Sequence, residues 1–346
     1  MKRLHTPLCD LLGIEHPVLC AGMGGGARPE LAAAVSDAGG LGVLGLGGAD
    51  PETIRREVAE TRELTEKPFG INLIIAESEE PDEAEEDREF IRNQVRTVGQ
   101  AGVRALFLFW GPVDDFVEDA RGHDVKLVVQ VGSVEEAVRA AEAGADAVIA
   151  QGIEAGGHVR GTMSVWDLLP AIVQALEPVP VLASGGIGDG RSFARALGLG
   201  AQGVSFGTRF VASDEFYAHP IYKQRIVDAT AEDTVYFADL YNEWWPNAPH
   251  RVLRNKLVEE WEAAGRPPPG QRPGEGTTIG TKRSLGGSLV EWPRYAVGVI
   301  TPDFEGDFDL APMWAGKSVA VVNDVKPAGE IVRELVRDAE AALAGV

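Results

Sequence analysis

The chain has 346 residues, 45% hydrophobic and 25% charged, the proportions of an ordinary globular protein, and these exclude a chain that is disordered throughout. Its 53 acidic residues against 32 basic ones give a formal net charge of −21, which excludes the broad positive surface of a protein that binds nucleic acid or an anionic membrane. Glycine is in excess: 42 residues, about 12% where about 7% is usual.

Eight short apolar runs in the first two-thirds of the chain predict strands. They are rich in Val, Ile, Leu and Phe and do not alternate with polar residues, which is typical of strands buried on both faces of a parallel sheet. The predicted strands cover residues 17–21, 41–46, 69–75, 104–109, 125–131, 146–150, 179–184 and 202–207.

Segments with helical spacing lie between these runs. In 133–143 the apolar residues recur every three or four positions, and Ser133 with Glu136 three residues later has the pattern of a capping box. Gly144 follows where a left-handed helix cap belongs. Further helices are predicted to begin at Pro51 and to cover 82–100, 165–176 and 327–344.

Eight strands, each followed by a helix, predict an α/β fold of the (β/α)8 TIM-barrel type. A doubly wound sheet is the alternative, because strand order cannot be read from one sequence. We expect the barrel in residues 1–212, a mostly helical extension or lid in 213–304, and a segment returning to the barrel in 305–346. Aromatic residues of the extension form either a lid surface or a contact between two copies in a homodimer.

The excess glycines gather at the ends of predicted strands. In a barrel the carboxyl ends of the strands form the face that carries the active site, and glycine is needed where backbone approaches a ligand or takes a positive φ. The clusters follow the first, sixth, seventh and eighth strands: Gly22, Gly24, Gly25 and Gly26; Gly152, Gly156 and Gly157; Gly185, Gly186, Gly188 and Gly190; and Gly207.

The segments 184–190 and 207–209 follow the last two strands, where barrels commonly bind a phosphate group. Their free N–H groups, together with a helix N-terminus, favour an anion. The alternative is a pair of tight turns without a ligand. The glycines at 24–26 lack the GxGxxG spacing of a dinucleotide fold, and the chain has no complete GxxxxGKS/T phosphate loop, so nucleotide hydrolysis has no support.

His158 closes the sequence QGIEAGGH at the end of the sixth strand. A histidine at this face can act as an acid, a base or the cationic partner of an anion; the alternative is a side chain that is solvated or bonded to backbone. Glu154 either orients the imidazole or is a solvated or helix-capping carboxylate. The chain shows no HxH, HxxxH or CxxC pattern, so we expect no catalytic metal. We also expect no serine nucleophile elbow.

Cys9 and Cys20 are too few for a disulfide framework in a chain of this length. The N-terminal residues contain no apolar stretch of the signal-peptide kind, and no run reaches the 18 apolar residues of a transmembrane helix. We therefore expect a cytoplasmic protein with reduced thiols, whose partner is a small-molecule substrate rather than a membrane or a nucleic acid.

Several motifs together resemble the nitronate monooxygenase family, formerly called 2-nitropropane dioxygenase-like. They are CDLLGIEHPVLCAGM, KPFGINL, AVIAQGIEAGGH, PVLASGGIGDG and GAQGVSFGTRFVAS followed by AHPIYK. The family also contains flavin-dependent enoyl-acyl-carrier-protein reductases and NAD(P)H:quinone reductases. The resemblance is good over 8–229, loose over 230–300 and resumes weakly at 311–337.

The resemblance implies FMN in a TIM barrel with a lid, and it assigns cofactor contacts residue by residue. It implies that Ala21, Gly22 and Met23 lie against the flavin ring and that Asn72 and Gln130 form hydrogen bonds with the flavin. Beneath the ribityl chain or ring it implies Gln151, with backbone contact from Gly156 and Gly157. Around the phosphate it implies Ser184, Gly185, Gly186, Gly207 and Thr208. On the substrate side it implies the catalytic residue His158.

Two positions depart from the family pattern. Gly22 stands where the family often has proline, and Lys317 stands where it often has glutamine. Lys317 either supplies a positive charge near the flavin or points to solvent. Because of these two changes, the resemblance does not fix the exact substrate.

The activity predicted first is that of a nitronate monooxygenase, which oxidises an alkyl nitronate with O2 to a carbonyl compound and nitrite. An NAD(P)H-dependent flavin reductase acting on a quinone or an enoyl thioester is the alternative. In that case Trp244, Trp245 and Trp261 either shape a larger acceptor pocket or pack inside the lid. A barrel that binds a phosphorylated ligand without redox chemistry is a remote third hypothesis.

Overall fold

The computed structural model describes residues 4–77, 81–284 and 286–345. Eight parallel strands form one sheet in the order β1-β9-β8-β6-β5-β4-β3-β2. Backbone hydrogen bonds close it into a barrel: Leu41 N–H donates to Val18 O and Cys20 N–H to Leu41 O, at 2.9 and 3.0 Å. Closure excludes the doubly wound alternative. The strands are β1 (Val18–Cys20), β2 (Gly42–Gly45), β3 (Phe69–Ile74), β4 (Ala105–Phe109), β5 (Lys126–Val131), β6 (Ala147–Gln151), β8 (Val181–Ser184) and β9 (Gly203–Phe206).

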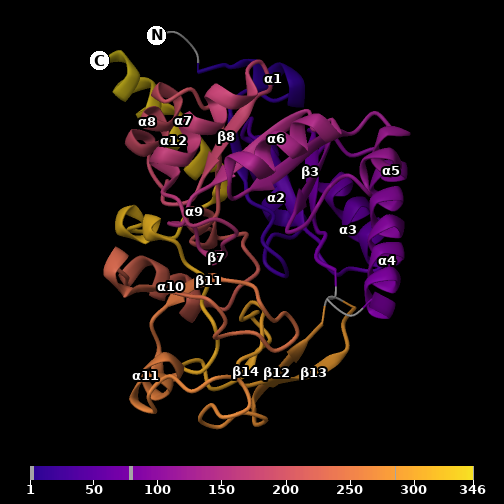
Figure 1. Cartoon of the computed structure of the whole chain (residues 1–346). Coiled ribbons are helices and arrows are strands. Elements are labelled where there is room, and N and C mark those ends of the chain that lie inside the picture. The colour runs from indigo at the N-terminus through magenta and orange to yellow at the C-terminus, as the bar shows by residue number, and fades with distance from the viewer. Residues whose placement is uncertain (1–3, 78–80, 285, 346) are drawn as a thin grey trace.

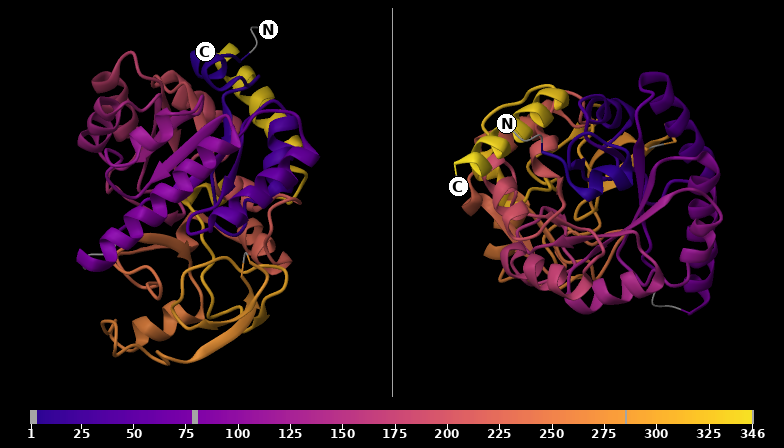
Figure 2. Two further views of the ribbon diagram at one scale, coloured as in Figure 1. Left: turned by 90° about the vertical axis from the view of Figure 1, so that its right-hand side faces the viewer. Right: turned by 90° about the horizontal axis from the view of Figure 1, so that it is seen from above.

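Helices form an outer layer around the strands (Figure 2). They are α2 (Pro29–Asp37), α3 (Pro51–Leu64), α4 (Pro81–Ala101), α5 (Val117–Arg121), α6 (Val134–Ala143), α7 (Val165–Leu176), α8 (Gly190–Gly198) and α9 (Thr208–Val211). The first helix, α1 (Pro7–Leu12), lies at the end of the barrel opposite the extension (Figure 1), where Leu8 and Leu12 share a buried cluster with strand residues such as Leu19. The last helix, α12 (Ala328–Ala344), packs between α8 and α2, so the C-terminal segment completes this layer. None of the helices in the described ranges is long and apolar enough to cross a membrane.

The ends of α6 show how local sequence sets these boundaries. Ser133 Oγ accepts a hydrogen bond from the Glu136 N–H at 3.1 Å, and Gly144 ends the helix at φ 106°. The Glu136 carboxylate does not return to the Ser133 N–H as a full capping box requires. It accepts instead from Gly132 N–H and from Arg160 Nε, each at 2.8 Å. The predicted helix is confirmed, and its first turn is also tied to the loop that follows β6.

The extension lies over one end of the barrel (Figure 1). The prediction that it is mostly helical is wrong, because strands hold about as many of its residues as helices do. Its β-branched and aromatic residues form strands around buried rings such as Trp292. Its elements are α10 (Pro220–Asp228), η1 (Ala231–Asp233), β10 (Thr234–Phe237), β11 (His250–Leu253), α11 (Lys256–Ala263), β12 (Thr278–Arg283) and β13 (Leu289–Pro293), with β14 (Glu305–Gly306) and η2 (Lys317–Val321) after it.

The extension and the barrel share a sheet. After β6 the chain forms a short strand, β7 (Gly157–His158), which pairs antiparallel with β11, so that His158 lies opposite His250. The sheet has the order β10-β11-β7. His158, which the sequence predicts at the barrel face, is therefore held by both the barrel and the extension. The domain boundaries at 212 and 304 stay a prediction.

Candidate active site

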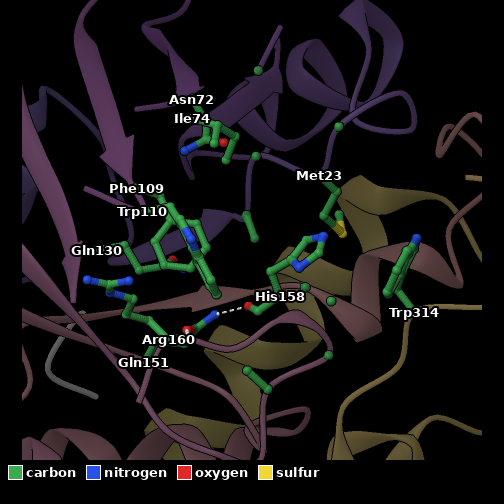
Figure 3. Close-up of a pocket in the computed structure, with 18 of the residues that line it drawn as sticks. Met23, Asn72, Ile74, Phe109, Trp110, Gln130, Gln151, His158, Arg160 and Trp314 are labelled. Carbon is green, nitrogen blue, oxygen red and sulfur yellow. Dashed lines mark hydrogen bonds between the residues drawn. The ribbon is translucent and has the colours of Figure 1, made fainter. Parts of the chain in front are cut away.

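A cavity of about 1410 Å3 opens at the carboxyl ends of the barrel strands, under the extension (Figure 3). Every site residue that the sequence predicts contributes to its wall, although their roles remain predictions. These residues are Ala21, Gly22, Met23, Asn72, Gln130, Gln151, Gly156, Gly157, His158, Ser184, Gly185, Gly186, Gly207 and Thr208.

The His158 imidazole is held as one tautomer. Its Nδ1 lies 3.2 Å from Ala248 O, and because a carbonyl oxygen only accepts, Nδ1 carries the proton. The other nitrogen, Nε2, is buried and has no hydrogen-bond partner among the described residues. Burial, and then the neighbouring His250, lower the pKa of His158 to about 3. A neutral ring with a free lone pair favours the role of base over that of cation.

His250 shares the same carbonyl. Its Nδ1 lies 2.9 Å from Ala248 O, and its Nε2 accepts from the Tyr241 N–H at 3.2 Å. The two imidazole centroids are 5.8 Å apart, and burial lowers the pKa of His250 to about 4. Nothing in the sequence singles out His250, because only the pairing of β7 with β11 brings the two rings together.

These two histidines predict a loss of stability in mild acid. In the unfolded chain both take up protons near pH 6.5, whereas in the folded protein they stay neutral until the pH approaches 4 or 3. Below pH 6.5 the unfolded state therefore binds more protons than the folded state, and the free energy of unfolding decreases as the pH is lowered. Between about pH 7 and pH 5 each histidine lowers the free energy of unfolding by about 2 kcal/mol. Urea titrations at both pH values measure this, and His250→Asn should lose about 2 kcal/mol less than the wild type; an identical loss would contradict the prediction.

Gln151 fixes the loop that carries His158. Its Nε2 donates to His158 O at 2.9 Å, and its Oε1 accepts from the Arg160 N–H at 3.0 Å (Figure 3). Gln151 is 4% exposed, so its amide binds the backbone on both sides of the loop. A hydrogen bond to the flavin would have to use its remaining amide hydrogen or oxygen lone pair.

We therefore expect Gln151→Met to destabilise the protein by about 1–3 kcal/mol, because two partly buried hydrogen bonds to backbone are lost while the volume is kept. Thermal unfolding measures this loss. Gln130→Met is the control, since Gln130 is only half-buried on the neighbouring strand; equal losses in the two variants would contradict the role given to Gln151.

Glu154 does not contact the imidazole. Its Oε1 accepts from Ser164 Oγ at 2.6 Å, and its Oε2 accepts from the Val165 N–H at 3.0 Å. Both groups stand at the start of α7, so the capping alternative is the one that the structure bears out.

The glycine loops after β8 and β9 leave backbone donors free. Gly185 and Gly186 have φ values of 96° and 71°. Across the described chain, the N–H groups of these two residues and of Thr208 have no acceptor. Thr208 Oγ1 accepts from the Gly316 N–H at 3.0 Å, which leaves its hydroxyl hydrogen available. The loops thus present a set of donors suited to a phosphate.

Two of the predicted anion contacts are used by the protein itself. The N-terminus of α8 is capped by its own Asp189 carboxylate, which accepts from the Ser192 N–H at 2.8 Å. The Ser184 hydroxyl donates to Ser205 O at 3.1 Å, so it offers a ligand only its lone pairs. The donors for a phosphate are therefore the loop amides rather than the helix end.

The glycines serve two different purposes. A Cβ on Gly22 would lie 2.2 Å from Asn72 Cβ, and one on Gly156 would lie 2.4 Å from the Gly316 N. These two are required by tight packing within the protein. A Cβ on Gly157 would meet nothing within 4 Å, and one on Gly207 only atoms at 3.9 Å or more. Glycine at these two positions leaves space on the cavity side.

Lys317 is exposed, and it is absent from the residues that line the cavity. Its backbone N–H donates to Glu154 O at 2.9 Å, which fixes the backbone and leaves the side chain outside. Of the two expectations for this residue, the solvent-facing one is confirmed.

Three tryptophans surround His158. The ring centroids of Trp245, Trp314 and Trp110 lie 4.0, 5.4 and 5.8 Å from that of the imidazole. The sequence pointed to Trp245 among the extension tryptophans, but nothing in it pointed to Trp110 or Trp314. Trp261 packs edge-on against Phe237 inside the extension, as the lid-core alternative expects.

No group of three or more His, Cys, Asp or Glu in the described chain lies where it could hold a metal ion. Charged groups on the cavity wall come instead from Glu77, Glu83, Asp87 and Arg160.

Comparison with known proteins agrees with this architecture. The family model for nitronate monooxygenase matches residues 5–338. A probable nitronate monooxygenase of Staphylococcus saprophyticus is 35% identical over 269 residues, covering 67% of this chain and 75% of that protein. The (3aS,4S,5R,7aS)-5-hydroxy-7a-methyl-1-oxo-octahydro-1H-indene-4-carboxyl-CoA dehydrogenase of Mycobacterium tuberculosis is 34% identical over 266 residues, covering 76% of this chain and 70% of that enzyme.

Among solved structures, FabK from Thermotoga maritima is 32% identical, with a TM-score of 0.80, and the match covers 99% of this chain and 98% of that one. The match to the family model runs through the whole barrel, the extension and most of the closing helix. The chain therefore belongs to the nitronate monooxygenase family, whose members are flavin-dependent oxidoreductases.

Proposed function

We propose that the chain is an FMN-dependent nitronate monooxygenase, which oxidises alkyl nitronates with O2 to a carbonyl compound and nitrite. Family membership supports the flavin-dependent redox chemistry and leaves the remote alternative, a barrel without redox chemistry, unsupported. The proposal names a small molecule as the partner.

The cavity residues fit FMN. The free N–H groups of Gly185, Gly186 and Thr208 suit its phosphate, and the open space beside Gly157 and Gly207 suits its ribityl chain and ring. When bound, FMN supplies the electron transfer between the substrate and O2. The protein holds the cofactor, excludes water and handles the substrate proton.

The observation that carries the proposal is the free lone pair of His158 Nε2. A neutral nitroalkane has an acidic hydrogen on the carbon that bears the nitro group. Nε2 accepts this proton as the C–H bond breaks, and the electron pair moves into the nitro group to give the nitronate. Ala248 O, which accepts from Nδ1, stabilises the imidazolium that forms.

Reduction of a quinone or enoyl thioester by NAD(P)H is the second candidate. The volume of the cavity, about 1410 Å3, favours it, because this exceeds the usual 300–1,000 Å3 of a ligand site. The charge of the wall speaks against it: within the described chain Arg160 is the one Lys or Arg on the wall, whereas Glu77, Glu83 and Asp87 are acidic. Nicotinamide nucleotides and coenzyme A thioesters carry phosphates, which such a wall repels.

Anaerobic mixing separates the two candidates. The oxidised holoenzyme is mixed with a nitroalkane, with the corresponding nitronate, with NADH and with NADPH, and flavin absorbance is followed. We expect bleaching by nitroalkane and nitronate, with nitrite released once air is admitted. Rapid bleaching by NADH or NADPH, with no response to nitronate, would reject the monooxygenase.

A further inference from the structure

The Trp245 indole lies against the imidazole of His158 where a substrate would have to lie. The two ring centroids are 4.0 Å apart with a tilt of 42°, which leaves no room for another molecule between them. Nε2 of His158 is also inaccessible. A substrate that gives a proton to Nε2 therefore has to replace the group that covers the imidazole, and Trp245 is the nearest ring.

The segment that carries Trp245 lies at the surface and is anchored at both ends. Trp244 is 59% exposed and has a φ of 77°, and Asn247 has a φ of 57°. Both ends of the segment return to Asp239, which accepts from Asn242 Nδ2 at 2.8 Å and from the Asn247 N–H at 3.0 Å. Opening such an exposed loop, closed at its base, disrupts little buried packing.

The walls that remain when Trp245 moves are aromatic and fixed. Trp314 donates from Nε1 to Gly298 O at 2.6 Å. Trp110 has a φ of 76° and lies beneath the Arg160 guanidinium, 5.4 Å from the ring centroid. Trp110 meets the His158 imidazole edge-on, at an interplanar angle of 73°, and such aromatic contacts favour a flat ring over a flexible chain of equal size. The space that Trp245 vacates is thus shaped for another flat ring.

The charge at this position favours a neutral ligand. Arg160, the one Lys or Arg on the wall within the described ranges, is already paired with Glu136 at 2.8 Å. The lone pair of His158 Nε2 attracts a hydrogen-bond donor and repels a carboxylate or a nitronate oxygen. A substrate arriving here is best bound with its proton still attached.

We propose that Trp245 holds the place of the substrate, and that the enzyme prefers neutral carbon acids with a flat apolar ring, such as aryl nitroalkanes, which His158 deprotonates to the nitronate that is then oxidised. The ring of the substrate replaces the indole and brings its acidic hydrogen to Nε2. This inference rests on the proposed function in taking His158 as the base. It adds the substrate class and makes Trp245 a specificity-determining residue.

Chemical labelling of His158 tests directly whether the Trp245 indole covers its imidazole. Diethyl pyrocarbonate acylates an unprotonated imidazole nitrogen, and mass spectrometry of the peptide that contains His158 gives the rate in the holoenzyme. We expect Trp245→Ala to react at least roughly tenfold faster than the wild type, with Trp245→Phe between them. Trp166→Phe, on a helix of the barrel's outer layer beside Arg195, should match the wild type. Equal rates in the wild type and Trp245→Ala would overturn the proposal.

Calorimetry with ligands that undergo no redox reaction tests the substrate class. Benzyl alcohol should bind several-fold more tightly than cyclohexylmethanol or propanol, and benzoate should bind at least roughly tenfold more weakly than benzyl alcohol. Trp245→Ala should bind benzyl alcohol several-fold more tightly, because no indole has to be displaced. Benzoate or propanol binding as well as benzyl alcohol would overturn the proposal. These measurements need no turnover, so absence of nitroalkane oxidation alone would reject only the proposed function.

Discussion

Replacing His158 by alanine should lower the turnover of a neutral nitroalkane by roughly 10²–10⁴-fold, the usual contribution of a positioned general base. The same variant supplied with the preformed nitronate should lose far less, because the proton has already left. Steady-state nitrite release with the two forms of one substrate gives both numbers. FMN content should be unchanged, since the proposal places His158 against the substrate rather than the cofactor.

The pH profile adds a second readout. Because burial lowers the pKa of His158 to about 3, its base form is present throughout neutral pH, and its titration should not reduce nitroalkane turnover until the pH falls toward 3. His158→Asn is the control for size and polarity. An equal loss on nitroalkane and nitronate would give His158 a binding role, and loss of FMN would give it a structural one.

Replacing Gly207 by leucine should weaken FMN binding by roughly 10²–10⁴-fold, since losing two hydrogen bonds to a charged phosphate costs about 3–6 kcal/mol. A Cβ at this position meets no protein atom closer than 3.9 Å, so the fold should tolerate the new side chain. That side chain would fill the space beside the free N–H of Thr208. Fluorescence titration of apoprotein with FMN measures the dissociation constant.

Gly122→Leu is the matched control, because Gly122 also has open space around it and lies at the exposed end of α5, away from the cavity. Both variants should unfold at the apoprotein's temperature in the absence of FMN. If Gly207→Leu bound FMN as tightly as Gly122→Leu, the phosphate would have to lie elsewhere.

The sequence determined the barrel because its signals are local. Eight apolar runs give strands buried on both faces, and residues such as Ser133 and Gly144 set helix ends through bonds to near neighbours. The same locality explains why a mostly helical extension is the wrong prediction. Its strand β11 pairs with β7 from a distant part of the chain, and aromatic segments of this kind suit a strand as well as a helix. The glycine clusters by themselves predict the face of the barrel on which the cavity lies.

The tertiary structure alone decided how the site works. The Ala248 carbonyl that fixes the tautomer of His158, the His250 beside it and the rings of Trp110, Trp245 and Trp314 come from distant parts of the chain. Glycines that look alike in the sequence divide into those packed against protein, such as Gly22, and those facing open space, such as Gly207. A sequence motif records which residues follow one another, whereas a proton's position and a cavity's shape depend on what folding brings beside them.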